Sequence, residues 1–240
     1  MAEVRRFRNR AQAGKLLAKA LAAHAQQPDA IVLALPRGGV PVAFAVAMTL
    51  GLALDILLVR KLGLPYQPEY AIGAVGSGGV RILQAGVPGL MGVTQEQVDA
   101  ITARELLEIE RRTRLYRGGR AQPVLADRTV IIVDDGIATG STALAAVQVA
   151  RGHGARRVIV AAPVAPPDTL AALQAVADEV ICLAAPPQFR AVSQWYDTFD
   201  QTSDEEVQDL LAMAWRTQAD RPPNTQLKPQ LKPTTGEDGT

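Results

Sequence analysis

Apolar and polar positions along the chain define two alternating kinds of segment. Short runs that are apolar throughout predict buried strands, whereas longer segments with apolar positions three or four residues apart predict amphipathic helices. Strands are expected at residues 30–35, 54–59, 129–133, 157–162 and 180–183. Helices are expected from a cap at Asn9 to about residue 25, and at residues 41–50, 95–116, 141–151, 167–176 and 204–214.

This order of segments predicts an α/β fold. Apolar strands that alternate with helices indicate a mostly parallel central sheet with helices on both faces. Two further apolar runs, 71–75 and 80–83, flank the turn sequence Gly76-Ser77-Gly78-Gly79 and predict a β-hairpin. Ligands of open parallel sheets bind at the carboxyl ends of the strands. The residues that follow each strand are therefore the candidates for chemistry.

One folded domain is expected over residues 1–216. Of all residues, 48% are apolar, which is enough for a sizeable core. From residue 217 onward the chain is rich in Pro, Gln, Thr and Lys, and Gln-Leu-Lys-Pro occurs twice, at 226–229 and 230–233. A segment with so few apolar residues cannot bury enough surface to fold, so residues 217–240 are predicted to be disordered.

Cysteine usage and hydropathy exclude several classes of protein. The one cysteine, Cys182, rules out an internal disulfide framework and a cysteine-rich zinc site, and its apolar surroundings predict a buried thiol. No apolar run reaches the ~18 residues that span a bilayer. The basic N-terminus is followed by Lys15 and Lys19 instead of a continuous apolar core, which argues against a secretory signal. A cytoplasmic protein with no membrane partner is expected.

Charge is unevenly distributed, although the net charge is only +1. The first 120 residues hold 16 basic and 9 acidic residues, and the last 120 hold 9 basic and 15 acidic residues. This asymmetry fits either ordinary solvated faces or a basic wall for an anionic ligand opposite an acidic sugar or metal site. No dense basic tract is interleaved with aromatic residues, so nucleic acid is not an expected partner.

The most informative residues follow the expected strand 129–133. Asp134 and Asp135 would repel each other and lose hydration at a strand end, unless they share a ligand that offers donors or a cation. The vicinal hydroxyls of a ribose and a bound Mg²⁺ both meet that need. The next residues, Ala138–Thr142, are small or hydroxylic and lead into a helix N-terminus, which is suited to an anion. Together the two features match the length of a sugar 5-phosphate.

Two other strand ends carry basic residues. After the strand 30–35, Arg37, Gly38 and Gly39 form a small glycine loop that leads into a helix. Backbone amides and a guanidinium suit a diphosphate, although a simple strand–helix turn has the same pattern. Arg60 and Lys61 follow the strand 54–59, where they are either anion ligands or a solvated basic pair.

The segment Val130–Thr142, VIIVDDGIATGST, resembles the signature of the type I phosphoribosyltransferases: an apolar strand, two acids, small residues, then Thr-Gly-Ser-Thr. This resemblance implies a Rossmann-like fold and 5-phosphoribosyl pyrophosphate (PRPP) as substrate. It implies that Asp134 and Asp135 hold the ribose and, directly or through water, Mg²⁺. The 5-phosphate would be held by the backbone and hydroxyls of Ala138, Thr139, Gly140, Ser141 and Thr142.

The resemblance also implies an activity. The family transfers the 5-phosphoribosyl group to a nucleobase or related nitrogen acceptor and releases pyrophosphate, and its arrangement allows a homodimer. Arg37, Gly38 and Gly39 would form a pyrophosphate loop, often of unusual peptide geometry. Arg60 and Lys61 would bind the pyrophosphate from a mobile, partly antiparallel loop that includes the hairpin and closes over the substrates. Asp135, Arg37 and Lys61 would be the catalytic residues.

A variable hood that selects the base is implied for residues 184–216. Phe189 and Trp195 lie there, and with Ile137 they are the candidates for a base pocket, because aromatic faces can stack a nucleobase. The same aromatic residues could instead form a small satellite core that packs the C-terminal helix.

Other functions fit less well. A Walker P-loop is excluded because no Gly-x-x-x-x-Gly-Lys-Ser/Thr pattern is present. A receiver-like phosphoaspartate domain would need its acids near the start of the domain and a later lysine on a strand end. The alternatives that stay open are a non-catalytic PRPP- or nucleotide-binding regulatory protein with this fold, and a partner domain of a larger system. Related bacterial proteins place this type of sequence beside hydrolase domains.

Overall fold

The computed structural model describes residues 6–67, 70–84 and 86–219 of the chain. Its centre is a five-stranded sheet of order β2-β1-β6-β7-β8, in which every neighbouring pair is parallel. The strands are β1 (Ala30–Ala34), β2 (Ala53–Ile56), β6 (Thr129–Val133), β7 (Arg157–Val164) and β8 (Glu179–Ala184). β1 and β6 are buried at every position, which explains why their sequences are apolar throughout.

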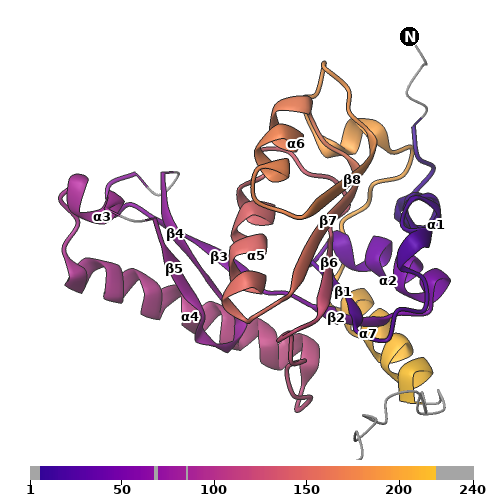
Figure 1. Ribbon diagram of the computed structural model, residues 1–240, viewed down its shortest axis with the longest axis horizontal. Helices are drawn as coiled ribbons and strands as arrows, with labels where there is room; N and C mark the ends of the chain where they lie inside the picture. The colour runs from indigo at the N-terminus through magenta and orange to yellow at the C-terminus, as the bar shows by residue number, and fades with distance from the viewer. Residues whose placement is uncertain (1–5, 68–69, 85, 220–240) are drawn as a thin grey trace, which may run out of the picture.

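Helices cover both faces of this sheet (Figure 1). One face carries α1 (Arg10–Ala20), α2 (Gly39–Leu50) and α7 (Asp204–Ala219), and the other carries α5 (Ser141–Gly152) and α6 (Pro167–Gln174). Alternate strand residues supply two separate cores. Val32 packs in the core that contains Leu17 and Leu211, whereas Leu33 packs in the core that contains Val149. The expected α/β architecture is confirmed. No helix among the described residues is both long enough and apolar enough to cross a membrane.

A second sheet of three antiparallel strands extends away from the first, past α5 (Figure 1). It consists of β3 (Val59–Gly63), β4 (Ala71–Gly76) and β5 (Arg81–Leu83), with a 3₁₀ turn, η2 (Ser77–Gly79), between the last two. The short helix α3 (Val87–Leu90) and the long helix α4 (Gln95–Arg117) complete this insert. The hairpin expected around the Gly-Ser-Gly-Gly turn is therefore confirmed, and Arg60 and Lys61 lie on the strand that pairs with it.

The single strand expected at residues 54–59 is wrong. The backbone N–H of Leu57 still donates to Ala34 of the central sheet, whereas the carbonyl of Leu58 accepts from Ser77 of the second sheet. Leu57 and Leu58 are both buried, so the chain changes sheets without leaving the core. A continuous apolar run cannot reveal a change of hydrogen-bonding partner.

The cap expected at Asn9 is confirmed, and the long helix α4 also begins with side-chain caps. Asn9 accepts a hydrogen bond from the backbone N–H of Gln12 at 2.9 Å, and Thr94 and Gln97 form a complete capping box at the start of α4. α1 nevertheless ends at Ala20, earlier than the expected residue 25, and a 3₁₀ turn, η1 (Ala22–His24), follows it.

The C-terminal boundary also differs from the expected one. α7 continues to Ala219, so an end of the domain at residue 216 falls inside a helix. Trp215 and Gln218 both donate to the carbonyl of Leu54, at 3.0 Å and 3.5 Å, and these bonds dock the last turns of α7 on β2. Residues 220–240, which hold most of the tail predicted to be disordered, lie outside the described residues.

Candidate active site

The two acids lie directly against the glycine loop. A Cβ atom added to Gly38 would lie 2.1 Å from Oδ2 of Asp135. One added to Gly39 would lie 2.7 Å from the carbonyl oxygen of Val133 and 3.1 Å from Oδ1 of Asp134. Only glycine allows the two strand ends to approach so closely. β1 and β6 are neighbours in the sheet, so the sequence-predicted loop and acid pair form one site.

Negative charge at the acid pair is only partly balanced. Burial, and then the charge of Asp135, raise the pKa of Asp134 well above its ordinary value. Asp135 is balanced by Arg10, whose Nε donates to Oδ2 at 2.7 Å, and both side chains are 13% exposed. Asp134 accepts only from the backbone N–H of Asp135, at 2.8 Å, within the described part of the chain. A ligand that brings hydroxyl donors or a cation would therefore find unbalanced negative charge here.

The expected phosphate seat is built around the start of α5. Gly140 has φ 78°, a left-handed conformation, and it is the N-cap of α5 without any side-chain capping bond. The first-turn amides of the helix therefore remain available to a ligand. The hydroxyl oxygens of Thr139 and Ser141 lie 2.7 Å apart. Thr169 fixes the loop by donating to the carbonyl of Ala138 at 2.7 Å. Two hydroxyls and the first-turn amides thus lie together at the start of α5, the groups that an anion would need.

Arg37 extends from the glycine loop towards α7. Its Nη1 lies 3.6 Å from Oδ1 of Asp204, which also accepts a hydrogen bond from the hydroxyl of Tyr116 at 2.6 Å. The peptide bond between Pro36 and Arg37 is cis, an unusual geometry of the kind that the resemblance implies for this loop. No sequence pattern predicts a place for Asp204 here, since nothing in the local pattern links the first residue of α7 to this loop.

A cavity of about 340 Å³, the hood cavity, opens beside Asp135 and the glycine loop. Its lining includes Arg10, Arg37 and Phe199, so the first helix, the glycine loop and the segment after β8 meet there. The guanidinium of Arg10 lies 3.9 Å from the centroid of the Phe199 ring, and its Nη1 donates to the carbonyl of Asp200 at 2.6 Å. No motif in the sequence predicts that Arg10 lies in this candidate site.

A second cavity, of about 350 Å³, lies between β3 and α4 and is called here the β3–α4 cavity. Arg60 and Lys61 line it together with Thr142 of the phosphate seat and with Arg104 and Glu105 of α4. The structure thus brings the basic pair of β3 close to the phosphate seat. Glu105 partly balances these cations, because it accepts from Nε of Arg60 at 2.8 Å and from Arg104 at 3.0 Å.

The aromatic residues of the expected hood form a small packed cluster. Phe189 and Trp195 are half-buried and pack with Phe7 and Tyr196. This satellite core joins the N-terminal segment, not the C-terminal helix, to the end of β8. The hydroxyl of Tyr196 donates to the carbonyl of Asp135 at 2.6 Å, which ties the cluster to the acid pair. Ile137 is 4% exposed and packs in the core on the α5 face.

The site offers few groups for a metal or for covalent catalysis. Among the described residues, no group of three or more His, Cys, Asp or Glu side chains could hold a metal ion. Asp134 and Asp135 are therefore the candidate metal ligands, and oxygens of a substrate would have to complete the coordination. Cys182 is half-buried, and burial raises the pKa of its thiol, which disfavours the nucleophilic thiolate.

Comparison with known proteins adds three findings. Residues 2–196 match the phosphoribosyl transferase domain family. Rv0571c of Mycobacterium tuberculosis H37Rv, whose name provisionally assigns it to the phosphoribosyl transferases, is 50% identical over 210 residues, which are 88% of this chain and 47% of that protein. MT0597 of strain CDC 1551, named in the same way, gives the same values, so the chain spans about half the length of these relatives. The crystal structure of TT1426 from Thermus thermophilus is 42% identical, with a TM-score of 0.80, and the match covers 87% of this chain and 98% of that one.

Proposed function

The chain belongs to the phosphoribosyl transferase family, and from that premise we propose that it transfers the 5-phosphoribosyl group of PRPP to a nucleobase or a related nitrogen acceptor and releases pyrophosphate. The observation that carries this proposal is the acid pair at the end of β6, which lies between a glycine loop on one side and an open helix N-terminus on the other. Since the chain spans about half of its curated relatives, the proposal concerns the activity of this domain.

PRPP binds, in this proposal, across the carboxyl edge of the sheet. The ribose hydroxyls donate to Asp134 and Asp135, which would offset the burial and the charge of Asp135 that together raise the pKa of Asp134. The 5-phosphate accepts from the first-turn amides of α5 and from the hydroxyls of Thr139 and Ser141. The hood cavity and the β3–α4 cavity leave space on either side of the bound sugar.

The pyrophosphate lies at the loop after β1. Gly38 and Gly39 offer their backbone without a side chain in the way, and α2, a helix of 12 residues, begins at Gly39 with its positive end towards the loop. Arg37 and Lys61 supply cations. A magnesium ion would be held by Asp134 and Asp135 together with substrate oxygens, as is common for Mg²⁺, and would add positive charge at the departing pyrophosphate.

The reaction needs no nucleophile from the protein. A lone pair on the acceptor nitrogen forms a bond to C1 of the ribose as the bond from C1 to the pyrophosphate oxygen breaks, and the nitrogen then loses its proton. Positive charge develops on the ribose and negative charge on the leaving group. The chain contributes by positioning the reactants and by stabilising the departing pyrophosphate, with Asp135, Arg37 and Lys61 as the catalytic residues.

Pyrophosphate release tests this proposal. The protein is incubated with PRPP, Mg²⁺ and a panel of nucleobases and amines, beside the variants Arg37→Ala and Lys61→Ala. The wild type should release pyrophosphate with at least one acceptor, and each variant should lose at least about tenfold in turnover while PRPP affinity falls less. Binding of PRPP without turnover on any acceptor would favour a regulatory PRPP-binding protein instead.

A further inference from the structure

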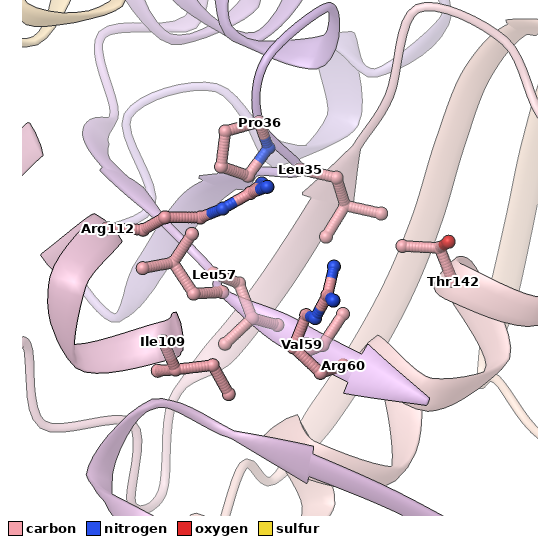
Figure 2. A pocket seen from close by; sticks show the side chains of 9 residues that line it. Leu35, Pro36, Leu57, Val59, Arg60, Ile109, Arg112 and Thr142 are labelled. Atoms are coloured by element: carbon pink, nitrogen blue, oxygen red, sulfur yellow. The ribbon is translucent and has the colours of Figure 1, made fainter. Parts of the chain in front are cut away.

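Two arginines from different parts of the insert line one small cavity beside the active site. Arg60 comes from β3 and Arg112 from α4, and with Pro36 and Thr142 they line a space of about 30 Å³, called here the arginine cavity (Figure 2). Pro36 immediately precedes the glycine loop, and Thr142 belongs to the phosphate seat. The two guanidinium groups therefore lie between the two segments proposed to bind the phosphates of PRPP. The larger β3–α4 cavity shares Arg60 and Thr142 with this space.

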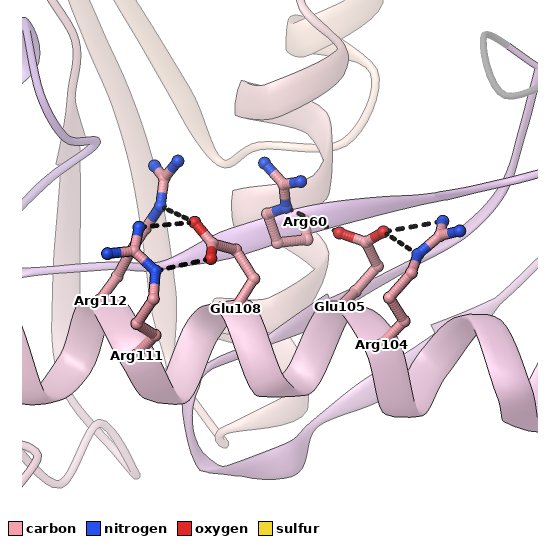
Figure 3. Close-up of polar contacts among 6 residues, drawn as sticks. All are labelled: Arg60, Arg104, Glu105, Glu108, Arg111 and Arg112. Atoms are coloured by element: carbon pink, nitrogen blue, oxygen red, sulfur yellow. Dashed lines mark hydrogen bonds and ion pairs between the residues drawn. The ribbon is translucent and has the colours of Figure 1, made fainter.

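A carboxylate on α4 holds each of these guanidinium groups through Nε (Figure 3). Glu105 accepts from Nε of Arg60 at 2.8 Å, and Glu108 accepts from Nε of Arg112 at 2.7 Å. Within the described part of the chain, the terminal nitrogens of both arginines have no acceptor, and Figure 3 shows them pointing away from the helix. Two oriented guanidinium groups with free terminal N–H donors are suited to a phosphate group.

The helix that presents Arg112 is itself fixed to the central sheet. Arg117, at the end of α4, is 1% exposed, and its Nε donates to Asp55 of β2 at 2.8 Å. Its Nη2 also donates to the carbonyl of Ile56 at 2.7 Å. Arg112 lies little more than one turn before this anchor, so its place over the glycine loop is determined by the sheet and not by the end of a free helix.

We propose that Arg112 joins Arg60, for which the resemblance already implies a pyrophosphate role, in binding the diphosphate of PRPP, and that Glu105 and Glu108 are positioning residues that orient the two guanidinium groups. This inference rests on the proposed function. The 5-phosphate already has the amides and hydroxyls at the start of α5, whereas the diphosphate carries more charge and gains more as it leaves. Cations are therefore most effective at the diphosphate.

The charge state of Glu108 fits this role. Hydrogen bonds from Arg111, and then from Arg112, lower the pKa of Glu108 to about 2. Glu108 therefore stays ionised at any pH near neutrality. Arg111 shares this carboxylate through Nε at 2.8 Å, but its side chain is 62% exposed and is not part of the arginine cavity. Arg111 is thus a matched control for Arg112, because it lies on the same helix and pairs with the same carboxylate.

The first test compares Arg112→Ala with Arg111→Ala in calorimetric titrations of the full chain with PRPP, inorganic pyrophosphate and ribose 5-phosphate, all with Mg²⁺. Arg112→Ala should lower the affinity for PRPP and pyrophosphate by about 10- to 100-fold, as expected for a lost hydrogen bond to a charged group, and leave ribose 5-phosphate unaffected. Arg111→Ala should change each affinity by less than about twofold, as is typical of an exposed pair.

Each other outcome contradicts the proposal in its own way. Equal losses for ribose 5-phosphate would assign the two arginines to the 5-phosphate. If the wild type binds pyrophosphate and Arg112→Ala binds it with the same affinity, the proposed arginine site is wrong. The proposed function would not be affected by that result. If the wild type binds neither PRPP nor pyrophosphate, the proposed function fails, and the arginine site fails with it.

A second test addresses the positioning role of Glu108. Glu108→Ala should weaken pyrophosphate binding, whereas Glu108→Gln, which keeps an oxygen acceptor for Nε of Arg112, should restore most of the loss. Glu110→Ala is the control, because Glu110 is exposed and pairs with Arg114, away from the arginine cavity. Thermal melting checks that all three variants fold. If Glu108→Ala binds pyrophosphate as tightly as the wild type does, Glu108 does not position Arg112.

Discussion

The negative charge of Asp135 is balanced by a residue from the other end of the domain. Arg10 lies 125 positions earlier in the chain, and only the packing of α1 beside the glycine loop brings it to the acid pair. The acids and the phosphate seat could be predicted because they occupy one contiguous stretch with a recognisable pattern. Arg10, Tyr196 and Asp204 could not, since each reaches the site through tertiary packing and none lies in a motif.

Removal of Arg10 should destabilise the protein. Arg10→Ala leaves the nearly buried carboxylate of Asp135 unpaired, and we expect a loss of about 2 kcal/mol in the free energy of unfolding, below the roughly 3–5 kcal/mol that a fully buried pair loses. Urea denaturation of Arg10→Ala, Asp135→Asn and the double variant measures the coupling between the two residues. Strictly additive effects would show that the ion pair does not stabilise the fold.

The raised pKa of Asp134 makes a second prediction with a defined sign. Because its folded pKa lies above the ordinary 3.8, the carboxyl group loses its proton more easily in the unfolded chain, and the fold loses stability as the pH rises above that value. Asp134→Asn should therefore melt at a higher temperature than the wild type at pH 7. The difference should shrink as the pH falls towards 3.8.

Asp99→Asn is the control for this experiment. Hydrogen bonds from Arg81 and Gln95 lower the pKa of Asp99, so its loss should not stabilise the protein at pH 7. The same Asp134→Asn variant should bind PRPP more weakly. If Asp134→Asn melts at or below the wild-type temperature at pH 7, the ionised carboxylate of Asp134 does not destabilise the fold.

At the scale of elements, the sequence predicts the positions of most helices and strands, but not β3 or α3 and not which strands pair. β6 was predicted with its observed bounds, and the hairpin was recognised from its glycine-rich turn. The change from β2 to β3 was not, because both Leu57 and Leu58 are buried and the apolar run does not break. A helix is predicted at residues 95–116, but its sequence does not reveal which of its arginines face the active site.

The anchor of α4 can be tested directly. Arg117→Met leaves Asp55 buried without its partner, and we expect a loss of about 3–5 kcal/mol in the free energy of unfolding. Adding Asp55→Asn should recover part of it, because burial already raises the pKa of Asp55 despite the neighbouring arginine. Arg114→Ala is the exposed control. Urea denaturation that shows no difference between Arg117→Met and Arg114→Ala would contradict the anchoring role.

The end of the domain gives a further prediction. A chain that ends at Ala219 should keep the stability of the full chain, because the composition of residues 220–240 cannot support a core. A chain that ends at Ala214 loses Trp215, which is half-buried and bonded to β2. It should lose about 2 kcal/mol, less than the roughly 3–5 kcal/mol for a fully buried tryptophan. Thermal melting of both chains decides where the domain ends.

For the whole molecule, the arrangement of elements explains why the site lies where it does. The carboxyl ends of β1 and β6 are neighbours, so a glycine loop and an acid pair that are far apart in the chain meet without any special contact. The sequence predicts that both segments lie at the carboxyl edge of a parallel sheet, but it does not predict that β1 and β6 are neighbours. The hood cavity and the β3–α4 cavity could not be predicted, because their walls come from α1, α4 and the segment after β8, whose relative positions no local pattern determines.

The central claim is that the acid pair holds the ribose of PRPP. Calorimetric titration of PRPP with Mg²⁺ into the wild type and into Asp134→Asn/Asp135→Asn tests it most directly. The wild type should bind one PRPP per chain, and the double variant, shown to be folded by circular dichroism, should bind at least about 100-fold more weakly because two charge-assisted contacts are lost. Equal affinity of the two proteins for PRPP would contradict the account.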